Sequence, residues 1–329
     1  MVKPGKDGPV RRRLATVSIY ALSWLLLTVS VPVWVALGLF IGLLRGRAFI
    51  ILRLLIFAWF YFGFELIALL LVGGVFLSRP AGEARSEALY RLQAWWGSLN
   101  LKAAQKLLRL QIEVEGARCV VPGPTILLIR HASILDTLLP ATYVQRPYGF
   151  RIRYVLKQEL LFDPCIDIVG NALPNYFVDR TGNTDRELEG IRSLVAQLGT
   201  DGVLIFPEGT RFSQKKRSKA LRMLSATRPE LHDAAQAMTH VLPPKPGGVL
   251  ALLDALPETD CVFFAHSGLE AFAKIKDLMS GEVVGSTVRV HMWRVDAREI
   301  PPSEEERLVW LYREWAKVNA LVGNQTETR

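Results

Sequence analysis

The chain has 329 residues, half of them hydrophobic, and a formal net charge of +9 at pH 7. This basic balance fits a solvated surface, an anionic membrane or nucleic acid. The cationic run Arg11–Arg13 adjoins a long apolar segment, which favours a membrane surface. No zinc-finger spacing and no RNA-binding aromatic signature is present, so nucleic acid is not an expected partner. Three widely separated cysteines argue against a disulfide scaffold or a structural zinc site and suit a reducing compartment.

Two apolar segments near the N-terminus predict a membrane hairpin over residues 14–78. Arg13 and Arg45 bracket 31 uncharged residues, and the second segment, residues 54–77, carries one charge, Glu65. Each segment reaches the roughly 20 residues that a helix needs to cross a bilayer. A cleaved signal peptide would have an apolar core of only about 7–15 residues, and no second segment would follow it at once.

The depth of this hairpin stays open from the sequence. If both helices cross the bilayer, the short connector carries Arg45 and Arg47 to the far side, against the positive-inside rule. A hairpin that dips into one leaflet keeps these arginines near one headgroup layer. Glu65 is expected either to pair, with Arg53 as a candidate, or to lie near an interface. In both cases the basic tail of residues 1–13 predicts that the chain ends are cytosolic.

The expected location follows from this orientation. We expect an integral or monotopic membrane protein whose active site faces the cytosol, at a bacterial inner membrane or the endoplasmic reticulum.

The rest of the chain predicts an α/β domain over residues 79–300 and a C-terminal amphipathic helix over residues 301–329. Ser303 and Glu306 form a capping box that opens this last helix. Strands that alternate with helices favour a mixed sheet flanked by helices. The strand patterns cover residues 111–116, 125–129, 153–156, 176–178, 203–206, 261–265 and 287–295, and helix patterns cover residues 84–110 and 185–198.

Two histidine–aspartate pairs share the spacing H-x4-D. His291 and Asp296 lie in an alternating strand, where residues five apart point to opposite faces about 17 Å apart, so they cannot form a dyad. His131 and Asp136 instead follow the end of a strand, at the turn into a helix expected near Ser133. There the carboxylate can accept from one ring nitrogen, fix the tautomer and leave the other nitrogen as a base. A lone histidine is more often structural, so this interpretation depends on its surroundings.

The tract Phe206–Arg211 supplies such surroundings. It follows a predicted strand, Gly209 permits close approach of the backbone, and Arg211 can hold an anion through two parallel hydrogen bonds. Arg180 follows another predicted strand in the same way. In α/β proteins ligands bind at the carboxyl ends of strands, so the two arginines are candidates for one phosphate site. Salt bridges within their own loops are the alternative interpretation.

Three blocks of this sequence resemble the lysophosphatidic acid (1-acylglycerol-3-phosphate) acyltransferase family. RHASILD, NYFVDR and FPEGTR appear in the family's order and spacing. The fourth block, HVLPPKPGG over residues 240–248, is closer to the branch of lysocardiolipin and other lysophospholipid acyltransferases. The resemblance spans roughly residues 15–270.

The resemblance implies a glycerol-3-phosphate acyltransferase-like fold and the transfer of a fatty acyl group from acyl-CoA or acyl carrier protein. The acceptor would be the free hydroxyl of a lysophospholipid, with lysophosphatidic acid first among the candidates. His131 would be the general base and Asp136 its orienter, with no metal and no cofactor. The implied partners are membrane lipids, the acceptor and the donor. The implied substrate contacts are Arg180, Glu208, Gly209, Thr210 and Arg211.

The sequence departs from the family pattern at two positions. Arg130 stands before the histidine where the family usually has asparagine, and Asn175 stands nearest to where the second block carries glycine. Both departures bear on the acceptor headgroup. An acyltransferase for another lysophospholipid or a lyso-aminolipid, and an inactive membrane-binding member of the fold, therefore remain as alternatives. The absence of a GxSxG elbow and of a P-loop argues against a serine hydrolase and a nucleotide-binding enzyme.

Overall fold

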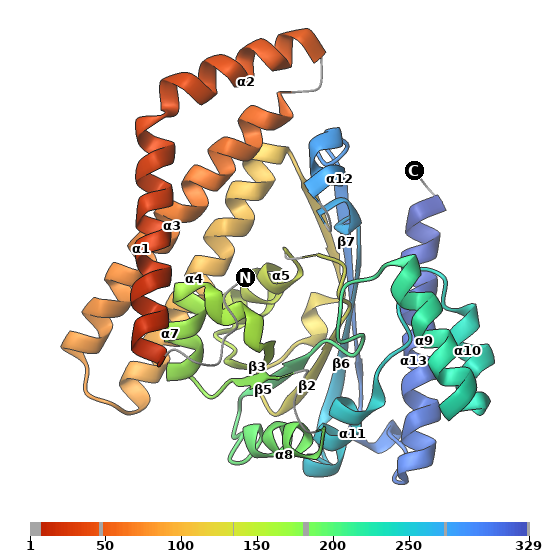
Figure 1. Cartoon of the computed structure of the whole chain (residues 1–329). Coiled ribbons are helices and arrows are strands. Elements are labelled where there is room, and N and C mark those ends of the chain that lie inside the picture. Colours follow the sequence, from red (N-terminus) through yellow and green to blue (C-terminus); the bar gives the residue numbers. More distant parts are fainter. Residues whose placement is uncertain (1–7, 46–48, 134, 180–183, 273–274, 328–329) are drawn as a thin grey trace.

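The computed structural model describes residues 8–45, 49–133, 135–179, 184–272 and 275–327 (Figure 1). A mixed sheet of seven strands runs through its centre, in the order β1-β7-β6-β2-β5-β3-β4. The pairing of β6 with β7 is antiparallel and all other pairings are parallel. The strands are β1 (Gln111–Glu115), β2 (Thr125–Ile129), β3 (Ile152–Lys157), β4 (Tyr176–Val178), β5 (Gly202–Ile205), β6 (Asp260–Ser267) and β7 (Thr287–Val295).

This sheet confirms the predicted α/β class and every predicted strand to within about two residues. All five residues of β2 are buried, as expected for a central parallel strand that is covered on both faces. Because β2 to β6 run in the same direction, their carboxyl ends lie along one edge of the sheet. That edge is the expected place for a ligand site.

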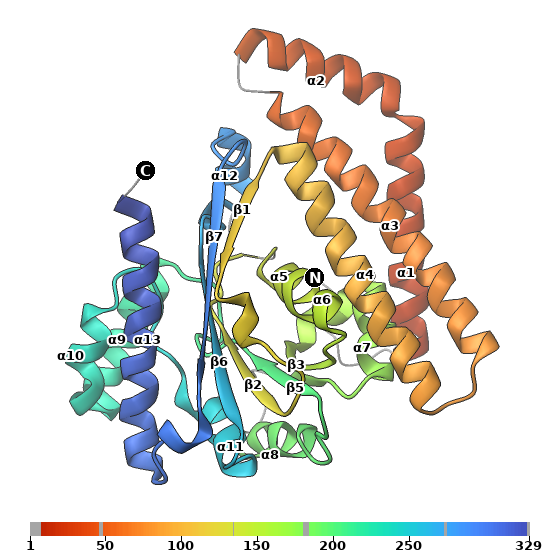
Figure 2. The same ribbon diagram turned by 180° about the vertical axis from the view of Figure 1, so that it is seen from behind.

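Helices cover both faces of the sheet (Figures 1 and 2). One hydrophobic core lies between the sheet and α4 (Glu83–Leu108), α5 (Leu138–Pro140) and the π-helical turn Ala141–Gln145, which the short helix α6 (Arg146–Tyr148) follows. A second core lies on the other face, under α8 (Thr184–Leu194), α10 (His232–Ala237), α11 (Pro246–Ala255) and α13 (Glu304–Glu327). The remaining helices of the domain are α7 (Pro164–Ala172), α9 (Gln214–Thr227) and α12 (Ile275–Ser280).

The N-terminal apolar region forms three helices rather than two. They are α1 (Pro9–Val29), α2 (Val31–Arg45) and α3 (Ile50–Ser78), and α1 and α2 meet at a bend of 66° beside Ser30. Within the described residues, α3 is long and apolar enough to cross a membrane, and the bent pair would be a second such segment if it counts as one. The helical arrangement is therefore consistent with a hairpin and does not by itself establish a membrane span.

The basic run at the N-terminus lies inside a helix, whereas the sequence analysis placed it in a tail ahead of the hairpin. Arg12 donates two hydrogen bonds to the carboxylate of Asp167 on α7, with N–O distances of 2.7 and 2.9 Å. Arg13 donates a third at 3.2 Å. The side chain of Asp167 is completely buried. These two arginines therefore hold α1 against α7, a contact between residues 155 positions apart that no local pattern could predict.

The middle of α3 is also bonded to the domain. Glu65 accepts a hydrogen bond from the backbone nitrogen of Cys165 at 2.8 Å, and the hydroxyl of Tyr61 donates to Asp163 at 2.6 Å. Arg53, the partner suggested for Glu65, donates to the carbonyl oxygen of Leu107. Glu65 thus satisfies the expectation of a partnered buried carboxylate, but its partner is the start of α7.

Candidate active site

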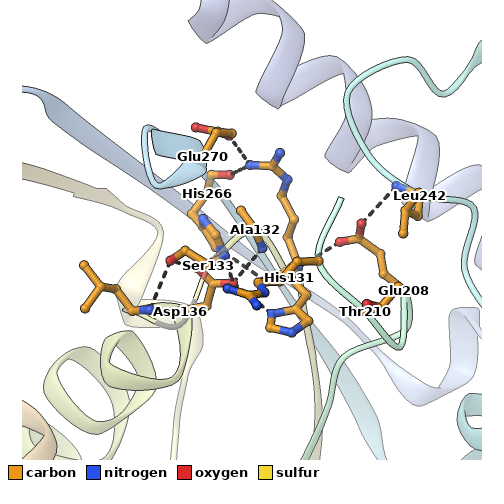
Figure 3. A network of polar contacts seen from close by, with 12 residues as sticks. His131, Ala132, Ser133, Asp136, Glu208, Thr210, Leu242, His266 and Glu270 are labelled. Atoms are coloured by element: carbon orange, nitrogen blue, oxygen red, sulfur yellow. Dashed lines mark hydrogen bonds and ion pairs between the residues drawn. The ribbon is translucent and has the colours of Figure 1, made fainter. Parts of the chain in front are cut away.

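His131 lies directly after β2, and its ring meets Asp136 as the spacing predicts. The distance from Nδ1 of His131 to Oδ2 of Asp136 is 3.0 Å. The same oxygen accepts the backbone N–H groups of Ala132 and Ser133, at 2.6 and 2.7 Å. The hydroxyl of Ser133 donates to the other oxygen at 2.9 Å. The turn between strand and helix therefore wraps around one buried carboxylate, as Figure 3 shows.

The charge states of the pair follow from these contacts. Burial alone would raise the pKa of Asp136, but His266, His131 and the N–H of Ser133 outweigh it and hold that pKa below its ordinary value. Burial lowers the pKa of His131, which Asp136 only partly opposes. An ionised Asp136 can only accept, so Nδ1 of His131 carries the proton and Nε2 presents a lone pair.

The ammonium of Lys157, the last residue of β3, lies next to that lone pair. Its Nζ is 3.2 Å from Nε2 of His131, and its charge helps to keep the pKa of His131 low. The sequence analysis did not select this residue. The sequence pattern that selected Arg180 and Arg211 also applies to Lys157, because it is a cation at the carboxyl end of a predicted strand.

Glu208 lies at the site but faces the backbone. It is 1% exposed, and its two carboxylate oxygens accept the N–H groups of His131 at 2.8 Å and Leu242 at 2.9 Å. Burial raises the pKa of Glu208 to about 7. Figure 3 shows this carboxylate between the histidine and the chain at Leu242. The geometry therefore favours a role for Glu208 in holding the backbone of His131 and Leu242 in place, over the substrate contact that the resemblance implied.

The other predicted contacts follow Glu208 in the chain. Gly209 has a φ of +64°, in the left-handed region that favours glycine, and a Cβ there would lie 3.2 Å from Cδ of Lys245. The hydroxyl of Thr210 accepts from Nζ of Lys216 at 2.8 Å. Arg211 is exposed and lines the cavity described next. Arg180 lies outside the described residues.

A cavity of about 860 Å³ adjoins the dyad. His131 and three cations contribute to its lining: Lys157, Arg211 and Lys245. Its size is in the range of ligand-binding cavities. Much of its remaining wall is apolar or aromatic, and α3, α4 and α7 contribute Phe57, Val72, Leu92, Trp96 and Val169 to it. The cavity thus joins a cationic region near the base to an apolar region under the N-terminal helices.

The two residues of the second H-x4-D pair, His291 and Asp296, interact with other partners and not with each other in the contacts of the described residues. His291 lies 3.2 Å from a carboxylate oxygen of Glu115, and Asp296 accepts hydrogen bonds from Arg298. Within the described residues no group of three or more histidine, cysteine, aspartate or glutamate side chains could hold a metal ion.

Arg130, the departure from the family pattern, points away from the cavity. It is 1% exposed, and its Nη1 donates to the carbonyl of His266 and to the carboxylate of Glu270, each at 2.5 Å. Nη2 donates to the carbonyl of His240 at 3.0 Å. Arg130 therefore ties the end of β2 to the end of β6 and to the chain before Leu242. Arg130 is absent from the lining of the cavity, so its bearing on the acceptor headgroup would be indirect.

Comparison with known proteins agrees with this geometry. Residues 111–264 match the Acyltransferase family model, a stretch that runs from the start of β1 into β6 and includes the dyad. The fold is similar to the crystal structure of the 1-acyl-sn-glycerophosphate (LPA) acyltransferase PlsC from Thermotoga maritima, with a TM-score of 0.52 and 19% identity. That match covers 80% of this chain and 88% of the other. Comparison with curated proteins gives no significant match.

Proposed function

We propose that this acyltransferase-family domain moves a fatty acyl group from a thioester to the free hydroxyl of a lysophospholipid, with lysophosphatidic acid as the leading acceptor. One observation carries the proposal: an oriented histidine, whose unprotonated Nε2 lies next to Lys157, lines a cavity that has both cationic and apolar walls. The similarity to an LPA acyltransferase structure and the resemblance of the sequence blocks support it. The block of residues 240–248 favours the lysocardiolipin branch within the family.

The proposed reaction uses His131 as a general base. Its Nε2 removes the proton of the acceptor hydroxyl while the oxygen attacks the thioester carbonyl. The tetrahedral intermediate collapses, the C–S bond breaks, and the thiolate leaves with the proton returned by the imidazolium. Thiolates leave readily, so no strong acid is needed, and Asp136 stabilises the transient positive charge on the ring. Neither metal nor covalent enzyme intermediate enters this scheme.

The ammonium of Lys157 is proposed to stabilise the negative charge that develops on the carbonyl oxygen of the thioester. Its ammonium lies 3.2 Å from Nε2 of His131, where the acceptor hydroxyl must bind. An entering hydroxyl displaces this contact and leaves the ammonium beside the reacting carbon. A fixed cation in a partly buried site stabilises an oxyanion strongly, because no solvent has to reorganise.

The acceptor phosphate is assigned to the cationic wall of the cavity. Arg211 and Lys245 line it, and Arg180 follows the neighbouring strand β4 in sequence. Arginine can bind two phosphate oxygens in parallel, which fixes the headgroup relative to the base. The apolar wall from α3, α4 and α7 suits an acyl chain, because burying each methylene contributes about 0.8 kcal/mol.

The N-terminal helices are proposed to hold the domain on a membrane. Large apolar side chains of α1 and α2 face outward, including Leu14, Leu22, Leu26, Val29, Leu43 and Leu44. The middle of α3 is bonded to the start of α7 through Glu65 and Tyr61. That tie keeps the middle of α3 beside the catalytic domain, so we favour entry into one leaflet over a hairpin that crosses the bilayer. The cytosolic face is the side that the basic N-terminus predicts.

The experiment that tests the function is an acyl-transfer assay with the purified full-length protein. Lysophosphatidic acid, other lysophospholipids and a lyso-aminolipid are offered in turn, each with acyl-CoA and with acyl carrier protein as donor. We expect phosphatidic acid as the main product from at least one donor. A preference for another lysolipid would correct the acceptor, and absence of transfer from every pair would overturn the activity and favour the inactive membrane-binding member.

A further inference from the structure

A second histidine is buried directly behind the dyad, on the side away from the cavity. His266 on β6 is 1% exposed, and its Nε2 lies 2.9 Å from the carbonyl oxygen of Arg130 and 3.6 Å from Oδ1 of Asp136. A carbonyl can only accept, so Nε2 of His266 carries a proton. This N–H donates to the carbonyl of Arg130 and lies close to the Asp136 oxygen that is not shared with His131, without a hydrogen bond to it.

The ring of His266 is held in this position from both sides. Its Nε2–H donates to the carbonyl of Arg130, and the guanidinium of Arg130 donates to the carbonyl of His266 at 2.5 Å. Glu270 accepts from the same Nη1 of Arg130 at 2.5 Å and from the N–H of Gly268 at 2.7 Å. The end of β6 is thereby held to the residue that precedes His131.

The ring also has a defined protonation state. Nδ1 of His266 is buried and makes no hydrogen bond to any part of the chain that the structure describes. A charged ring would leave a buried N–H without an acceptor, which costs about 1–3 kcal/mol. Burial accordingly lowers the pKa of His266; the neighbouring Arg130 also lowers it, while Asp136 and Glu270 oppose the shift. His266 is thus neutral at pH 7 and acts on Asp136 through its dipole.

We propose that His266 is a positioning residue of the His131–Asp136 dyad: its N–H dipole acts on the second oxygen of Asp136, which Ser133 holds by a hydrogen bond, and moderates how strongly that carboxylate stabilises the protonated form of His131. The proposal rests on the acyl transfer described above, but it makes a claim about His131 that can be measured without turnover. Without the N–H of His266, more of the carboxylate's negative charge acts on the imidazole. The pKa of His131 should therefore rise.

Other charged groups next to the His131–Asp136 pair also act on His131. Lys157 and Arg211 lower the pKa of His131, and Glu208 accepts the backbone N–H of His131. Among the described residues, His266 meets the dyad at Asp136 and at the carbonyl of Arg130, the residue before His131. We expect a change at His266 to reach the ring of His131 mainly through Asp136.

Three variants test the proposal. His266→Leu removes the donor, and His266→Gln keeps an amide N–H near the position of Nε2. His232→Leu is the matched control, because His232 is a partly exposed histidine on α10 outside the site. We expect His266→Leu to lower kcat about tenfold or more with little change in KM, as loss of a residue that orients a reactive group does. The acid limb of its pH–rate profile should move to higher pH, and His266→Gln should restore both.

Histidine ring NMR on the ¹⁵N-labelled protein in detergent gives the readout that needs no activity. Wild-type His266 should be neutral with the proton on Nε2, and His131 should be neutral with the proton on Nδ1. The titration of His131 should move to higher pH in His266→Leu. A charged His266, a proton on its Nδ1, or an unmoved titration of His131 would overturn the proposal, even if His266→Leu were too unstable to assay. An inactive wild type that shows the expected tautomers would instead count against the proposed function alone.

Discussion

At the scale of single residues, the proposed chemistry depends on the charge states of His131 and Asp136. A general base acts only when it is unprotonated, and burial holds the pKa of His131 below its ordinary value of 6.5. The acid limb of the acyl-transfer rate should therefore be centred below pH 6.5, because the base loses activity only as it becomes protonated. A pH–rate profile of kcat/KM for the acceptor measures this. An acid limb centred above pH 6.5 would contradict the environment assigned to His131.

Asp136→Asn tests the orientation of the ring. The amide can turn an N–H group toward Nδ1 of His131, which favours the tautomer that has its proton on Nε2 and no lone pair there. We expect a loss of roughly 10³–10⁴-fold in kcat, as for an aspartate that fixes a catalytic histidine tautomer elsewhere. The same change at Asp296, which bonds to Arg298 on the surface, should leave the rate unaltered. A mild effect at Asp136 would mean that the carboxylate only shapes the turn.

Arg211→Lys tests the phosphate assignment. Lysine keeps the charge but loses the two parallel bonds, and a charge-assisted hydrogen bond contributes about 1.5–3 kcal/mol. We expect the specificity constant for the acceptor to fall about tenfold or more while the KM for the donor stays unchanged. Lys219→Ala, an exposed cation on α9, is the control. Equal damage toward donor and acceptor, with a lower Tm, would favour a role in holding the loop. Arg180→Ala is predicted to act like Arg211→Lys.

At the scale of elements, sequence patterns predicted the strands better than the helices. Each strand is a short apolar or alternating run between turn residues, so local sequence suffices. Several helices of the domain were not predicted, and three of them show different reasons. α7 has nine residues, fewer than the roughly 11 over which a helical period is recognised. α9 carries five cations and has no buried residue, and α11 opens on Pro246–Gly248 and is then almost wholly apolar.

The contacts between elements explain what sequence could predict of the site. His131 and Asp136 are five residues apart, so the turn alone brings them together. Lys157 and His266 reach the same place only because β3 and β6 lie on either side of β2 and β5 in the sheet. That order depends on pairings between residues distant in the chain, such as Thr125 of β2 with Asp260 of β6 and Ile152 of β3 with Gly202 of β5. Local spacing carries no information about such neighbours.

The attachment of α1 to α7 provides a test at this scale. Asp167 is buried and accepts from both Arg12 and Arg13. Asp167→Asn removes the charge that both arginines share, and we expect it to lower the free energy of unfolding by about 1.5–3 kcal/mol. Glu87→Gln is the control, because Glu87 pairs with Arg91 on the surface and such pairs contribute about 0–1 kcal/mol. Equal denaturant midpoints for the two variants would show that the α1–α7 contact adds no stability.

At the scale of the whole molecule, the structure is an α/β domain that carries His131 and Asp136, with the apolar helices α1, α2 and α3 attached to it. α3 contributes to the cavity wall as well as to the outward apolar surface. This arrangement places the region proposed for the acyl chain directly beneath the layer that would contact lipid. A lysophospholipid could then present its hydroxyl to His131 while its chain stays close to the bilayer.

Membrane attachment through apolar burial makes a clear prediction. High salt should leave the protein on membranes, and so should alkaline carbonate, because neither weakens the burial of apolar side chains in lipid. A detergent should release it. The measurement is the distribution of the full-length protein between pellet and supernatant after each wash. Release by salt alone would mean that the attachment is electrostatic and peripheral.

The central claim is that His131 is the base for acyl transfer, and the direct test compares two histidine variants that share the H-x4-D spacing. Initial rates of transfer from acyl-CoA to lysophosphatidic acid in lipid vesicles are measured for wild type, His131→Ala and His291→Ala, at equal amounts of folded, membrane-bound protein. A general base contributes about 10²–10⁴-fold, so His131→Ala should lose at least a hundredfold while His291→Ala stays within a few fold of wild type. Near-full turnover by His131→Ala, or its loss in a folded His291→Ala, would contradict the assignment of the active site.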